Sequence, residues 1–138
     1  MQLNYPRFMI LSLIAAFGIS GCGTTVPVKS AGNEADTVSQ LVVARAQARW
    51  DALRKRDMDA AYQFISPAGR SLMSAEAYLP RVNTQFWRGA KSKEAICVAE
   101  TCEVTVMVDM LLEGVKFTTP VKETWILDAG KWWFVYQG

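Results

Sequence analysis

Three kinds of side chain in this sequence could take part in chemistry: carboxylates, tyrosines and three cysteines. The chain has 138 residues and no histidine, which excludes a Ser-His-Asp triad, a Cys-His pair and most zinc sites. We therefore expect no bound metal and no cofactor. Lys plus Arg is 15 and Asp plus Glu is 13, a net charge of +2. So small a charge gives no strongly basic surface of the kind that binds nucleic acid.

The remaining catalytic hypothesis is a carboxylate and a tyrosine that share a pocket. Glu123 is the better carboxylate, because it shares one face of a predicted strand with the aromatic Trp125. Asp109 is a weaker candidate, and Tyr62 or Tyr78 could donate a hydrogen bond to an oxyanion. A buried carboxylate has a raised pKa and can act as a general acid or base. In the alternative interpretation Glu123 pairs with a Lys or Arg on a neighbouring strand at a wet face, Asp109 is exposed, and Tyr62 is a core residue.

Two of the cysteines, Cys97 and Cys102, are separated by four residues between two predicted strands. A short loop between antiparallel strands places its flanking residues opposite each other, close enough for a disulfide. A redox pair and a metal site are the alternatives. Both are weak, because the spacing is not C-x-x-C and no histidine or further cysteine completes a site. We therefore predict a structural disulfide between Cys97 and Cys102.

The third cysteine, Cys22, follows a leader segment. Residues 1–7 are polar with one basic side chain, and residues 8–19 are mostly apolar. This run is too short for a stable membrane span, which needs about 20 residues, and is typical of a secretory signal. It ends in Ile19-Ser20-Gly21-Cys22, which resembles the bacterial lipobox. The resemblance implies cleavage before Cys22 and acylation of that cysteine with palmitate-type chains; the alternative is an ordinary signal with an incidental cysteine.

The lipobox resemblance also implies a location. Gly23 follows the cysteine where an inner-membrane retention signal would have Asp, so the outer membrane of a Gram-negative cell is favoured, with the domain facing the periplasm. That compartment is oxidising, which suits a disulfide. We expect residues 1–21 to be the signal peptide, residues 22–35 the lipidated cysteine and a polar tether, and residues 36–138 the folded domain.

The first predicted element of the domain is a helix over residues 37–56 with Asp36 as its N-cap. Its apolar side chains fall within an arc of about 100° on a helical wheel, and they are Val42, Val43, Ala46, Trp50 and Leu53. Arg45, Arg49 and Arg56 form a neighbouring arc. We interpret this arc as a solvated flank whose stems cover the core edge; the alternative is a strip that binds phosphate or lipid headgroups.

Two shorter helices and four strands complete the pattern. The helices are expected at residues 58–65, capped by Asp57, and at residues 74–87, capped by Ser74, with a turn at 66–69 between them. Pro80 should kink the second of these helices or start a new helix. Alternating apolar residues predict strands at 95–98, 102–112, 116–128 and 131–136. Pro120 indicates an edge position or a bulge within its strand. Helices followed by an antiparallel meander indicate an α+β fold.

The order of these motifs resembles the nuclear-transport-factor-2-like superfamily, also called SnoaL-like or ketosteroid-isomerase-like. The resemblance rests on Trp50, the break at Asp57, Tyr62-Gln63-Phe64 and the closing segment ETWILDAGKW at residues 123–132, and it covers residues 36–138. It implies a cone: N-terminal helices packed on a curved antiparallel meander sheet, with an apolar pocket between them. Superfamily members include isomerases, dehydratases, cyclases and non-catalytic binding or dimerising modules, so the fold does not fix the function.

We therefore expect a membrane-anchored lipoprotein of the cell envelope that acts as a non-catalytic binding or assembly module. Its partner would be an envelope protein complex or a small apolar ligand, contacted through Trp50, Trp125, Trp132 and Trp133. Because Trp132 and Trp133 are adjacent in a strand, they should point to opposite faces. The alternatives are an isomerase- or hydrolase-type enzyme that uses the carboxylate and tyrosine, and a homodimeric structural module.

Overall fold

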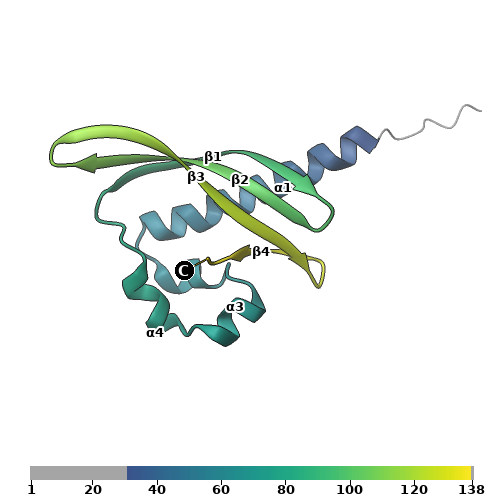
Figure 1. The fold of residues 1–138 in the computed structure, drawn as a ribbon, viewed down its shortest axis with the longest axis horizontal. Coiled ribbons are helices and arrows are strands. Elements are labelled where there is room, and N and C mark those ends of the chain that lie inside the picture. The colour runs from purple at the N-terminus through teal and green to yellow at the C-terminus, as the bar shows by residue number, and fades with distance from the viewer. Residues whose placement is uncertain (1–30, 138) are drawn as a thin grey trace, which may run out of the picture.

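The computed structural model describes residues 31–137, so the predicted signal peptide, Cys22 and most of the predicted tether lie outside the described residues. Helices come first: α1 (Ala31–Arg54), α2 (Met58–Tyr62), α3 (Pro67–Leu72), α4 (Ala75–Tyr78) and the 3-10 helix η1 (Leu79–Arg81). The strands follow: β1 (Trp87–Val98), β2 (Thr101–Leu112), β3 (Val115–Asp128) and β4 (Lys131–Val135). They form one antiparallel sheet in the order β1-β2-β3-β4, with α1 along one face (Figure 1). The predicted α+β class is confirmed.

Helix α1 packs on the sheet, chiefly on β1, through the predicted apolar stripe. Val42, Ala46, Trp50 and Leu53 are each at most 3% exposed, and burying a large apolar side chain contributes about 1.5–3 kcal/mol. The helix begins at Ala31 instead of near residue 37, so Asp36 is an exposed residue inside the helix and not its N-cap. The first turns carry no apolar period, which is why sequence periodicity placed the start too late. Within residues 31–137, no helix combines the length and apolar character that crossing a bilayer requires.

Side-chain caps start the short helices that follow α1. Asp57 Oδ1 accepts a hydrogen bond from the Ala60 amide at 3.0 Å, and Ser74 Oγ accepts one from the Ala77 amide at 3.3 Å. Both predicted caps are confirmed, and each satisfies one of the free amides of a first helical turn.

Two predictions about this helical region are wrong. The predicted turn at 66–69 is the start of α3, where Ser66 Oγ accepts from the Gly69 amide at 3.1 Å and Pro67 occupies the first turn. The same Ser-Pro pair is favourable in a turn and at a helix start, so the local sequence did not separate the two. The third predicted helix ends early, because α4 stops at Tyr78 and Val82 is already extended. Pro80 lies in the first turn of the separate η1 helix, which confirms the prediction that it could start a new helix.

The sheet turns one face of β2 toward the core. Cys102, Val104, Val106 and Val108 are buried there, as their alternation with exposed or half-buried residues predicts. Strand β1 begins at Trp87, well before the predicted residue 95. Its first half is rich in Gly, Ala, Ser and Lys, which have little intrinsic strand preference. Pairing with β2 along its length holds this segment extended.

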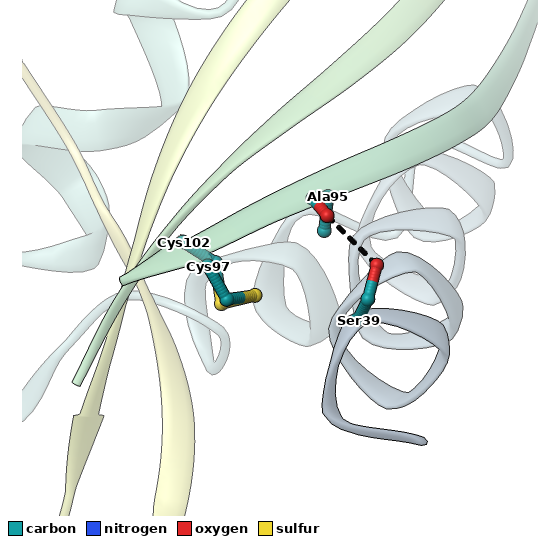
Figure 2. Close-up of a disulfide and its surroundings, with 4 residues drawn as sticks. All are labelled: Ser39, Ala95, Cys97 and Cys102. Carbon is teal, nitrogen blue, oxygen red and sulfur yellow. Dashed lines mark hydrogen bonds between the residues drawn. A yellow bond between two sulfur atoms is a disulfide. The ribbon is translucent and has the colours of Figure 1, made fainter. Parts of the chain in front are cut away.

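Polar groups from α1 cover the outer edge of β1. Gln47 Oε1 accepts from the Ser92 amide at 2.8 Å, and Gln47 Nε2 donates to the Ala90 carbonyl at 3.2 Å. Ser39 Oγ donates to the Ala95 carbonyl at 2.7 Å, as Figure 2 shows. These bonds occupy backbone groups that an uncovered edge strand would offer to another strand.

The opposite edge is closed in a similar way. The Phe134 amide donates to the Phe64 carbonyl at 2.8 Å, and the Ser66 amide donates to the Phe134 carbonyl at 3.0 Å. Strand β4 pairs with β3 only at residues 124–128, so Pro120 pairs with Met107 of β2 and has no β4 residue on its other side. The predicted edge position of Pro120 is confirmed, and its missing N–H suits that position.

The structure contains the predicted disulfide between Cys97 and Cys102 (Figure 2). The two residues face each other in the β1–β2 register, with their Cα atoms 4.0 Å apart. The connection is tighter than predicted, because Val98 and Thr101 also pair and leave Ala99 and Glu100 as the turn. The bridge therefore fixes the end of this hairpin beside the N-terminal half of α1.

Replacing both cysteines, Cys97→Ala with Cys102→Ala, should lower the free energy of unfolding by about 2 kcal/mol, since the bridge closes a short loop. Urea denaturation monitored by tryptophan fluorescence measures this loss. Adding dithiothreitol to the unsubstituted chain should produce the same loss and should leave the double variant unchanged. Equal stability of oxidised and reduced protein would contradict the prediction.

Candidate functional site

A cavity of about 370 Å³ opens between the C-terminal half of α1, η1 and the inner face of the sheet. We call it the inner pocket. Its volume lies within the range of small-molecule sites, roughly 300–1,000 Å³. Most of the side chains that line it are aromatic or aliphatic, and they are Trp50, Trp87, Val82, Val108, Met110, Val121, Phe134, Val135 and Tyr136. The polar residues of its lining are Arg49, Arg81, Asn83, Lys122, Glu123, Thr124 and Gln137.

The walls of the inner pocket follow from strand alternation and ring packing. Val108 and Met110 stand on the same face of β2 as the buried valines, at the end where the helices no longer fill the space. The rings of Trp50 and Trp87 pack with their centroids 4.8 Å apart. Phe134 and Tyr136 are in edge contact at 6.5 Å. The pocket is thus an extension of the core that stays open.

Glu123 is the acidic group of the pocket, and it is only 4% exposed. Arg49 Nη1 donates to its Oε1 at 2.5 Å, and Trp50 Nε1 donates to the same oxygen at 2.7 Å. Trp125 Nε1 donates to Oε2 at 3.1 Å. Burial raises the pKa of Glu123, while the charge of Arg49 and the two indole hydrogen bonds oppose that rise. Both carboxylate oxygens therefore have partners within the protein.

Arg49 is the basic half of this buried pair, at 5% exposed. Its guanidinium carbon lies 3.7 Å from the centroid of the Phe134 ring, and its Nη2 donates to the Tyr78 hydroxyl at 3.3 Å. Its Nε is buried without a hydrogen-bond partner among the described residues. Removing two charges from water is costly unless they pair and are hydrogen-bonded. Arg49 and Glu123 pair, and all their charged atoms except Arg49 Nε have hydrogen-bond partners among the described residues.

The three arginines of the arc predicted from the helical wheel, Arg45, Arg49 and Arg56, have different surroundings in the structure. Arg45 Nε donates to the Trp132 carbonyl at 2.9 Å, and Arg56 is exposed just beyond the end of α1. Neither a solvated flank nor a strip for phosphate or lipid headgroups describes Arg49, so both interpretations are wrong for that residue. The wheel shows which residues share a side of the helix, but Glu123 comes from a strand far along the chain.

The three catalytic candidates do not meet. Tyr62 donates its hydroxyl to the Met73 carbonyl at 2.7 Å, as expected of a core tyrosine with a hydrogen-bonded tip. Asp109 is exposed and accepts from Thr118 Oγ1 at 2.7 Å. The prediction that Glu123 pairs with a basic residue is right about the kind of partner. It is wrong about the place, because the partner comes from α1 and the pair is buried.

The four predicted binding tryptophans divide by position. Trp50 lines the inner pocket, whereas Trp125 and Trp132 are buried in the core outside the lining. Trp133 is half-buried, with Lys131 Nζ 4.3 Å from its ring centroid and the Arg70 guanidinium carbon at 5.3 Å. The adjacent pair does point to opposite faces, as predicted.

Sequence reasoning missed several residues of the lining. Phe134 and Tyr136 share a face with Trp132 at a period of two, a signal that would have found them. Trp87 was placed at the end of a helix, because the strand that it starts has little strand character. Arg81 gave no signal, since it comes from the short η1 helix.

Among known proteins, the similarity found for this chain is one of fold. No protein-family model and no curated protein matches this chain. The structure is similar to the solution structure of RPA3114, a SEC-C motif containing protein from Rhodopseudomonas palustris, with a TM-score of 0.51 and 13% identity over 64% of this chain and 70% of that chain. At this identity the similarity concerns the fold alone.

Proposed function

We propose that the chain is a lipid-anchored, non-catalytic binding module of the cell envelope whose ligand occupies the inner pocket. The observation that carries this proposal is an open, largely apolar pocket whose acidic side chain, Glu123, is already held by three donors. Apolar walls with a few placed polar groups are typical of small-molecule sites. The pocket therefore favours a small apolar ligand over the protein partner that the sequence also allows.

The hydrogen bonds of Glu123 argue against an acid–base role. A general base must lie within hydrogen-bond reach of the proton that it removes, and Glu123 already uses three of the roughly four acceptor positions of its carboxylate on donors from the protein. Here a guanidinium and two indole N–H groups converge on the carboxylate, and the hydroxyl of Tyr62 is bonded to a backbone carbonyl elsewhere. The arrangement instead suits a structural role, in which Glu123 accepts a hydrogen bond from Trp50 Nε1 and holds the Trp50 ring at the wall of the pocket.

We also propose that the domain has the nuclear-transport-factor-2-like cone and that Cys22 carries its lipid. The described residues form a meander sheet with helices on its inner face (Figure 1), and the inner pocket lies between the two. The superfamily resemblance implies the same arrangement. The lipid anchor rests on the lipobox-like residues before Cys22. Acyl chains on that cysteine would hold the domain at a membrane without a spanning helix.

A neutral apolar probe tests the pocket. The full chain in phospholipid nanodiscs should bind radiolabelled decanol above the amount taken up by empty nanodiscs. Met110→Trp should weaken this binding about tenfold, because the larger side chain fills the cavity that Met110 lines.

Met107→Trp is the matched control, since it makes the same change on the same strand at a half-buried residue outside the lining. It should leave decanol binding unchanged. Uptake equal to that of empty nanodiscs, or equal weakening by the two substitutions, would contradict the proposed function. Circular dichroism of each variant confirms that the fold is retained.

A further inference from the structure

We infer that the ligand of the inner pocket carries a single negative charge, which Arg81 binds at the edge of the pocket. The ligand class is a small amphipathic carboxylate, such as a medium-chain fatty acid. This inference rests on the proposed function and adds the chemistry of the ligand's head. It is carried by the juxtaposition of an apolar cavity with a basic side chain, Arg81, that has no ion-pair or hydrogen-bond partner among the described residues.

The inference follows from the balance of charge around the pocket. Among the described residues that line it, three are basic and one is acidic. Arg49 is neutralised by Glu123 within the pocket. Lys122 pairs through its Nζ with Glu103 Oε1 at 2.5 Å on an exposed part of the sheet. Arg81 remains: it is exposed, it lines the pocket, and it is in none of the ion pairs found among residues 31–137.

The chemistry of Arg81 selects the head group. A guanidinium presents a planar fork of N–H donors that matches a carboxylate in two parallel hydrogen bonds. The single positive charge of Arg81 balances a ligand with one negative charge. A doubly charged phosphate would need a second cation to balance it. Within residues 31–137 Arg81 has no hydrogen bond or ion pair to break, so the cost of turning its side chain toward the ligand is the loss of its rotamer freedom.

The walls select the rest of the ligand. Trp87, Met110 and Val121 line the same pocket as Arg81. Their aliphatic and ring-carbon surfaces can contact an apolar group of the ligand but form no hydrogen bonds with it. Burial of methylene groups against such walls stabilises a hydrocarbon chain, while the head stays near water beside Arg81. A molecule with both parts would fit better than one that has only the apolar part.

The test compares probes that differ in the head group. Radiolabelled decanoate, decanol and decylamine are measured against the full chain in nanodiscs, with empty nanodiscs subtracted. Decanoate should bind roughly tenfold more tightly than decanol, and decylamine more weakly than both. Arg81→Gln should bring decanoate to the affinity of decanol and leave decanol unchanged. Arg81→Glu should reverse the order, so that decylamine binds better than decanoate.

Arg88→Gln is the matched control, because it removes the same charge from an exposed arginine outside the lining. It should keep the preference for decanoate. Equal binding of decanoate and decanol by the unsubstituted chain, or an equal effect of Arg81→Gln and Arg88→Gln, would overturn the anionic head while the proposed function stands. Failure of all three probes to bind would overturn the proposed function itself.

Discussion

Arg49→Met is expected to lower the free energy of unfolding by about 3–5 kcal/mol, because it leaves the Glu123 carboxylate buried without its counter-charge. The substitution also removes the guanidinium that lies over the Phe134 ring, so the loss includes that cation–π contact together with the counter-charge. A domain of this size has a total stability of about 5–15 kcal/mol, so a substantial part of it depends on this pair. Urea denaturation at neutral pH, followed by tryptophan fluorescence, measures the change.

A second substitution separates the charge from other effects. Arg49→Met combined with Glu123→Gln should recover part of the loss, because the amide is neutral and its oxygen can still accept from Trp50. Arg45→Met is the comparison variant on the same helix: it removes a half-buried bond to a backbone carbonyl and should cost only about 1.5–3 kcal/mol. A loss for Arg49→Met no larger than that for Arg45→Met would contradict the importance of the buried pair.

Cys22→Ala is expected to release the chain from the membrane completely, because a buried acyl chain contributes about 0.8 kcal/mol per methylene and the alanine cannot be acylated. Fractionation of cells into membrane and soluble parts measures the change. Mass spectrometry of the unsubstituted chain should find a mature N-terminus at Cys22 with acyl groups attached.

The other two cysteines supply the control. The Cys97→Ala, Cys102→Ala double variant lacks the disulfide and keeps Cys22, so it should remain in the membrane fraction. Retention of Cys22→Ala on membranes, or a mature chain that starts at another residue, would contradict the lipid anchor.

Local patterns predicted much of the fold. The apolar stripe from Val42 to Leu53 correctly predicted the buried face of α1, and Asp57 and Ser74 were correctly predicted as helix caps. These features could be predicted because each depends only on residues that are close together in the sequence. The disulfide between Cys97 and Cys102 was also local, since a short hairpin sets its geometry. The helix that starts after Ser66 was predicted as a turn, because a Ser-Pro pair suits both a turn and a helix start.

The candidate site was predicted only in part, because it is made by contacts between distant segments. Glu123 was identified as the carboxylate among aromatics, but Arg49 lies 74 residues away in the sequence and its role depends on how α1 crosses the sheet. Trp87 belongs to a strand that pairing with β2 imposes against weak local preference. Arg81 could not be identified from the sequence as a ligand-binding residue, because it differs from the other basic residues of the lining only in having no ion pair. The ion pairs of Arg49 and Lys122 are visible only in the structure.

The length of α1 has a consequence for how the pocket meets its cargo. The helix starts at Ala31 and reaches the pocket lining at Arg49 and Trp50, which is about 27 Å along its axis at 1.5 Å per residue. Under the proposed lipid anchor, the pocket would lie at the end of α1 that is farther along the chain from Cys22. Its distance from the bilayer would then depend on how this helix is tilted against the membrane.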